Sequence, residues 1–94
     1  MRSDESKAFD DSSEGGFSAL VLMFGTMGLV HLGAAPDPGS GETRVDLTQA
    51  KQAIDLLELL KVKTAGNLTA GESRMLDDLL FDLRMRYLDA MRGA

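Results

Sequence analysis

Hydrophobic residues recur at helical spacing in three segments of the chain, and turn-forming residues separate these segments. Residues 17–32 carry apolar side chains on every face of a helix and contain no charge, whereas residues 46–65 have a broad apolar stripe and residues 69–92 have an apolar stripe and a charged face. Apolar residues spaced three and four apart are typical of helices that pack on one side against a core. The pattern predicts an all-α protein, a three-helix arrangement without strands.

The expected ends of these helices carry recognisable capping residues. Asp46 and Thr69 each precede an apolar run, and Gln49 and Glu72 follow them at the three-residue spacing of a capping box. Gly33 stands where the first helix should stop. Helices are therefore expected at about 17–32, 46–65 and 69–92, within a single helical domain at 17–94.

Residues 1–16 have a different composition from the rest of the chain. They are rich in Ser, Asp and Glu, contain few apolar residues and end in two glycines. Such a segment cannot bury enough surface to offset its ordering entropy, so the sequence predicts a disordered acidic tail. Phe9 is read as an incidental residue of this tail, with a role as a docking anchor for another protein as the alternative.

The uncharged run at 17–32 is expected to be buried on all sides, because a helix that is apolar all round has no face for water. Its residues span about 24 Å as a helix, which is short for roughly 30 Å of hydrocarbon. We therefore expect a second copy of the chain to cover it, in a homodimer or higher oligomer that completes the fold. Gly25 and Gly28 would form a notch for a closely crossing helix. The predicted self-association residues are Phe17, Leu20, Phe24, Gly25, Met27, Gly28, His31 and Leu57.

Charge and composition narrow the functional classes. Ten Lys and Arg residues against fifteen Asp and Glu give a net charge of −5, which disfavours nucleic acid as a partner. The chain has no cysteine, so disulfides and thiolate metal sites are excluded. The residues before the apolar run are mainly acidic, unlike the start of a signal peptide. We expect a cytoplasmic protein, and these criteria disfavour membrane association.

His31 and the aspartates of the last helix are the residues that could carry chemistry, but their own helices lack the catalytic or metal-ligating groups that such a site needs. The positions three and four residues from His31, the only histidine, bear no polar side chain, so a core or interface histidine with a satisfied hydrogen bond is favoured, and a pH sensor at an interface is the alternative. The acidic residues of the last helix lack the Glu-x-x-His motif of a di-metal bundle. The sequence predicts no catalytic residue, metal or cofactor.

Several stretches resemble one bacterial family. "VDLTQAKQAIDLLELLKVKTAGNLT" and "LDDLLFDLRMRYLD", preceded by "LVHLG", are similar to the domain of unknown function 1844 family over roughly residues 17–89. The resemblance implies a small helical bacterial protein and carries no catalytic residues with it. Ala70 stands where proline often follows "GNLT" in that pattern, a change suited to the first turn of a helix.

These observations together favour a non-enzymatic interaction module or adaptor that self-associates and docks a regulatory or signalling protein. The residues expected to dock that partner are Phe9, Asp78, Asp82 and Arg86. One alternative is a membrane-associated protein inserted through residues 17–32. A second alternative is a small ligand-binding or enzymatic bundle that uses His31 and the aspartates of the last helix.

Overall fold

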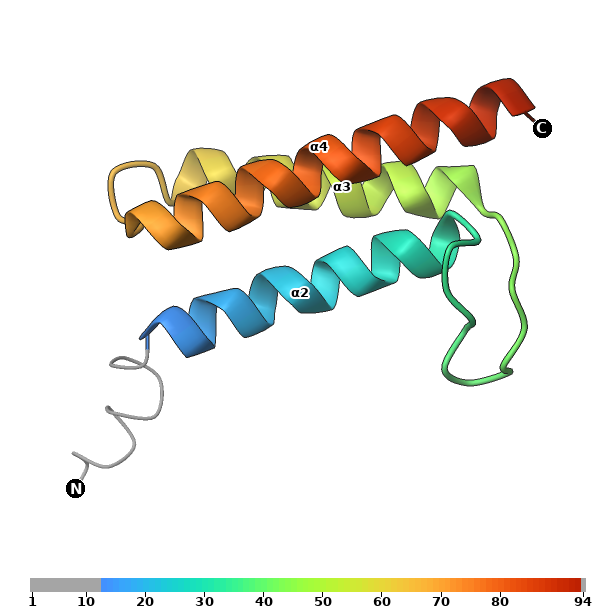
Figure 1. The fold of residues 1–94 in the computed structure, drawn as a ribbon, viewed down its shortest axis with the longest axis horizontal. Helices are drawn as coiled ribbons and strands as arrows, with labels where there is room; N and C mark the ends of the chain where they lie inside the picture. Colours follow the sequence, from blue (N-terminus) through green and yellow to red (C-terminus); the bar gives the residue numbers. More distant parts are fainter. Residues whose placement is uncertain (1–12, 94) are drawn as a thin grey trace.

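Three helices form where the hydrophobic periodicity places them. The computed structural model describes residues 13–93, and its helices are α2 (Ser13–His31), α3 (Leu47–Lys63) and α4 (Ala70–Gly93). Figure 1 shows α3 running antiparallel to both α2 and α4, with α2 lying along the pair. The predicted three-helix, all-α fold is confirmed, and within residues 13–93 the extended pairing is limited to one isolated bridge.

The first helix begins earlier than the sequence pattern suggested. Residues 13–16, assigned above to the disordered tail, belong to α2. Serine and glutamate tolerate a first helical turn, and the helix extends through the two glycines that we read as its boundary. Residues 1–12, including Phe9, lie outside the described residues.

Two capping arrangements fix where α3 and α4 begin. The Asp46 side chain accepts a hydrogen bond from the Gln49 backbone N–H at 3.1 Å. At the start of α4 the box is reciprocal: Glu72 N–H donates to Thr69 Oγ1 at 3.1 Å, and Thr69 N–H donates to Glu72 Oε1 at 2.8 Å. This bond explains why Glu72 can be buried, since its carboxylate has a donor.

A closed loop joins α2 to α3. Gly33, at φ +76°, ends α2 in a Schellman arrangement, in which its N–H donates to Val30 and the N–H of Ala34 donates to Leu29. The N–H of Asp46 donates to the His31 carbonyl at 2.7 Å, so the two ends of the loop are tied together. The loop projects from one end of the molecule (Figure 1) and fixes the start of α3 beside the end of α2.

The core consists of one stripe from each helix. Its largest fully buried side chains are Val21, Leu57, Leu76, Leu80 and Leu83. Burying such a side chain stabilises the fold by about 1.5–3 kcal/mol. The core is therefore made mainly of leucines from α3 and α4, and α2 contributes a narrow stripe.

The two glycines of α2 allow α4 to approach its backbone closely. A Cβ built on Gly25 would come within 2.6 Å of Leu79 Cδ2, and one on Gly28 would come within 3.2 Å of Leu83 Cδ2. Both glycines are buried. The notch that we predicted from the sequence is thus filled within the chain, by α4.

Within residues 13–93, the rest of α2 is left uncovered. Leu22, Met23 and Met27 are each about half exposed or more. One chain therefore leaves part of this helix exposed, because two neighbouring helices can cover only one stripe of a third, and the expected cover by a second copy remains a prediction.

Candidate functional site

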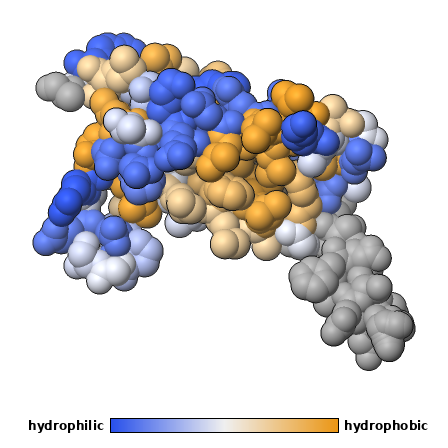
Figure 2. All heavy atoms as spheres, turned by 180° about the vertical axis from the view of Figure 1, so that it is seen from behind, coloured by the Kyte–Doolittle hydropathy of each residue, from blue (hydrophilic) through white to orange (hydrophobic). Residues whose placement is uncertain are grey.

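Exposed hydrophobic side chains gather where α2 lies beside α3. They are between 39% and 64% exposed. Figure 2 shows a continuous hydrophobic surface on this side of the molecule, bordered above by hydrophilic residues. From their exposure and their positions on the two helices, we assign to this surface, which we call the α2–α3 face, Leu20, Met23, Met27, Leu56 and Leu59.

The helical spacing of these residues explains why they share one surface. On α2, Leu20, Met23 and Met27 follow one another at intervals of three and four. On α3, Leu56 and Leu59 are three residues apart. Residues at these intervals lie on one side of a helix, next to the buried stripe rather than within it.

A small hollow marks the boundary between the two helices. Its volume is about 40 Å³, and its lining combines apolar side chains with the amides of Gln49 and Gln52. The other lining residues are Phe24, Met27, His31, Ala53 and Leu56. The face therefore has an indentation large enough for the end of one side chain, with hydrogen-bonding groups at its edge.

Five of the predicted self-association residues lie on or beside this face. Leu20 and Met27 are members of it, and Phe24 and His31 line the hollow. Phe17 is half-buried and packs against the core. These residues were singled out because they form a stripe at helical spacing.

The other three predicted residues lie elsewhere. Leu57 is fully buried in the core, and the backbones of Gly25 and Gly28 face Leu79 and Leu83 of α4. None of the three can touch a second copy while the chain keeps this fold. The physical reason is that small residues let any helix approach, and the helix that does so belongs to the same chain.

Three members of the face are absent from the predicted set. Met23, Leu56 and Leu59 were read as widening the apolar stripes of their helices. The excess of apolar positions on the two helices is the sequence feature that could have indicated these residues. An apolar stripe that is wider than the core requires leaves apolar side chains exposed at its edges. Which edge stays open depends on where the third helix packs.

His31 also lines a second cavity, under the loop. This cavity has a volume of about 290 Å³, and its lining also includes three acidic residues from the loop and its end, Asp37, Glu42 and Asp46. Val30, Ser40 and Arg44 complete the lining. Within residues 13–93, no group of three metal-ligating side chains is arranged to hold an ion.

The predicted docking residues of α4 are on its surface. Asp82 accepts a hydrogen bond from Arg86 at 3.0 Å, and both side chains are about half exposed. Asp78 is exposed. The charges of these residues face solvent. No other helix or loop of residues 13–93 packs beside them to form a site.

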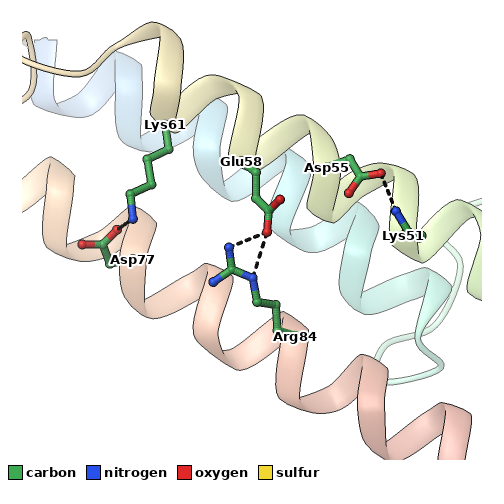
Figure 3. A network of polar contacts seen from close by, with 6 residues as sticks. All are labelled: Lys51, Asp55, Glu58, Lys61, Asp77 and Arg84. Atoms are coloured by element: carbon green, nitrogen blue, oxygen red, sulfur yellow. Dashed lines mark hydrogen bonds and ion pairs between the residues drawn. The ribbon is translucent and has the colours of Figure 1, made fainter.

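Ion pairs also connect α3 to α4, as Figure 3 shows. Lys61 contacts Asp77 at 2.8 Å, and Arg84 Nε donates to Glu58 at 2.9 Å. Within α3, Asp55 accepts a hydrogen bond from Lys51, and this bond together with the negative charge of Asp55 raises the pKa of the Lys51 amine. Exposed pairs of this kind contribute little stability, about 0–1 kcal/mol each.

Among the described residues, the helices are all too short or too polar to cross a membrane. The uncharged run in α2 is interrupted by serine, threonine, histidine and glycine, which lowers its hydropathy.

Comparison with known proteins identifies the family. The family model described as "Domain of unknown function (DUF1844)" matches residues 14–89. Comparisons with curated proteins and with solved structures gave no match. The match begins at the first turns of α2 and ends near the end of α4, so it spans all three helices. The chain is therefore a member of the DUF1844 family.

Proposed function

We propose that this protein is a non-enzymatic interaction module that self-associates through the α2–α3 face. Two copies would bury the same surface against each other across a two-fold axis. The proposal rests on one observation above all, the hydrophobic surface that remains exposed beside a well-packed core, to which five exposed side chains of α2 and α3 are assigned.

The composition of this face supports an interface. Monomeric proteins rarely expose large contiguous apolar patches, and interface centres are enriched in methionine and depleted in charge. Met23 and Met27 are flexible side chains that adapt to a facing surface. The hollow beside Met27 offers space for one side chain of the second copy, and Gln49 and Gln52 provide the polar edge that interfaces commonly have.

A further protein partner remains part of the proposal. Asp82 and Arg86 of α4 are half-exposed and carry the charge that would orient such a partner. Phe9 belongs to the same hypothesis but lies outside the described residues. As the sequence led us to expect, the module would act in the bacterial cytoplasm.

The oligomeric state in detergent-free buffer tests the proposal. We expect the untagged protein to have the mass of a dimer or larger by sedimentation equilibrium. Met23→Glu places a charge between Leu20 and Met27 on the face, where Met23 is 64% exposed, so it should halve the number of copies without unfolding the chain.

Leu22→Glu is the matched control. Leu22 is also exposed on α2 but lies about 100° around the helix from Met23, outside the face. Leu22→Glu should leave the mass unchanged. A wild-type monomer at all concentrations, or a Met23→Glu variant with unchanged mass, would overturn the proposal.

A further inference from the structure

A second line of hydrophobic side chains lies on the outward side of α4. Phe81, Met85 and Leu88 are between 43% and 66% exposed. Their spacing is four and then three residues, which is the narrow seam of a coiled coil. We call these three residues the α4 strip. They lie opposite the stripe of α4 that is buried in the core, so neither of the other two helices within residues 13–93 covers them.

The charges at the two ends of this strip have opposite signs. Asp78 precedes Phe81 by three residues and Arg92 follows Leu88 by four, so both continue the same line along the helix. Both are exposed. A negative charge, Asp78, thus adjoins the N-terminal end of the strip and a positive charge, Arg92, adjoins its C-terminal end. Arg74, one turn before Asp78 on the same line, lies farther out and would extend beyond residue 92 of an antiparallel neighbour.

The charges that flank the strip are already paired within the chain. Arg84 binds Glu58 on α3, and Asp77 binds Lys61. Among the described residues, Arg92 has a single ion-pair contact, a long one of 3.6 Å to Asp89, between side chains that are about 70% exposed. Arg92 can therefore exchange this contact for a new one at little cost in free energy. The paired residues beside the strip, Arg84 and Asp77, add no net charge to it.

We propose that the α4 strip binds the α4 strip of a second copy in antiparallel orientation. A two-fold axis near Met85 would set Phe81 of one copy beside Leu88 of the other and bring Asp78 close to Arg92 at both ends. A parallel pair would instead oppose Asp78 to Asp78 and Arg92 to Arg92. The charge pattern therefore selects both the occupant, another copy of this chain, and its direction.

This contact is distinct from the α2–α3 face, and it uses Asp78 for self-association instead of docking another protein. Asp82 and Arg86 lie off the strip and are left for that role. A chain with two different two-fold contacts forms a tetramer of two dimers when the assembly closes. We therefore expect four copies in the wild-type assembly.

Sedimentation equilibrium separates the two contacts. Phe81→Glu should reduce four copies to two, Met23→Glu should also leave two, and the double variant should be a monomer. Leu22→Glu, which touches neither surface, should keep four. A wild-type dimer that Phe81→Glu leaves unchanged would overturn the α4 contact while the proposed function stands, and a Met23→Glu variant with unchanged mass would do the reverse.

Cysteine cross-linking tests the direction of the helices, since the chain contains no natural cysteine. In the Met23→Glu background, Met85→Cys should form a disulfide between two copies when oxidised glutathione accepts the two electrons and two protons of the thiols. Arg74→Cys, on the same side of α4 but about 16 Å along the helix from residue 85, should not. A parallel pair would cross-link at both positions and overturn the proposed geometry.

A charge exchange tests the polar ends. In the same background, Asp78→Arg or Arg92→Asp alone should weaken dimerisation about tenfold, because each replaces two attractions by two repulsions. The double exchange, Asp78→Arg with Arg92→Asp, should restore the wild-type dissociation constant. Failure of the double variant to recover would contradict the antiparallel pairing.

Discussion

Single residues decide how closely the helices of this protein approach. Gly28 lowers the stability of the helix by about 1 kcal/mol relative to alanine. Because it has no side chain, Leu83 of α4 can pack against the backbone of α2. Met23, five residues earlier, has a high helix propensity but remains exposed. The difference follows from their angular positions on one helix, since one faces the core and the other faces away.

Gly28→Leu tests this assignment. Leu83 is fully buried, and a Cβ at residue 28 would already lie 3.2 Å from Leu83 Cδ2, so a leucine there must push α4 outward. We expect the free energy of unfolding to fall by about 3 kcal/mol in urea titrations. Thr26→Leu, at an exposed position of the same helix, should change it by no more than about 0.5 kcal/mol.

The opposite outcome would also be informative. If Gly28→Leu unfolded at the wild-type urea concentration but had fewer copies per assembly, the glycine notch would belong to the contact between chains, as the sequence pattern first suggested.

Among the elements, the α2–α3 connection is more ordered than its composition implies. Its residues are rich in proline, glycine and aspartate, yet its ends are joined by the Asp46–His31 backbone hydrogen bond and by an antiparallel bridge between Leu32 and Val45. Asp37 accepts hydrogen bonds within the loop, including one from Gly39 N–H at 2.7 Å. The loop therefore sets the angle at which α3 leaves α2, which in turn sets the neighbours in the α2–α3 face.

Two alanine substitutions separate backbone strain from steric overlap in this loop. Gly33 and Gly41 have nearly the same positive φ, +76° and +74°, but a Cβ at Gly33 would meet Val45 Cγ2 at 2.9 Å, whereas one at Gly41 would meet nothing within 4 Å. Gly41→Ala should cost about 1 kcal/mol of unfolding free energy and Gly33→Ala about 2 or more. Equal costs in thermal or urea unfolding would show that the contact with Val45 is unimportant.

Taken as a whole molecule, the chain has more apolar surface than three helices can enclose. The core uses one stripe of each helix, and two further apolar surfaces, the α2–α3 face and the α4 strip, point in different directions. Small domains gain little net stability from their own cores, so surface buried between copies would add to the stability of the fold itself.

This coupling predicts a melting temperature that depends on protein concentration. We expect Tm of the wild-type protein to rise by roughly 3–6 °C for each tenfold increase in concentration, because dilution favours the unfolded, dissociated chains. The Met23→Glu/Phe81→Glu variant should melt at one temperature over the same range in calorimetry. A wild-type Tm that does not change with concentration would mean that folding is complete in the single chain.

The helices, their capping residues and the surplus of apolar side chains all follow from the order of residues alone. These features depend on local spacing and on hydrogen bonds between residues three or four apart, such as the Thr69–Glu72 box, and the family match rests on the same residues. The start of α2 was predicted at about residue 17, whereas the helix begins at Ser13. Serine and glycine are compatible with both a tail and a first helical turn.

Three features required the packed structure. Gly25 and Gly28 face α4, Leu57 is buried, and one exposed face unites Met23 with Leu56 and Leu59. A helix that is apolar all round has no preferred side, so the side that it buries is chosen by the packing of its neighbours and cannot be read from its own pattern.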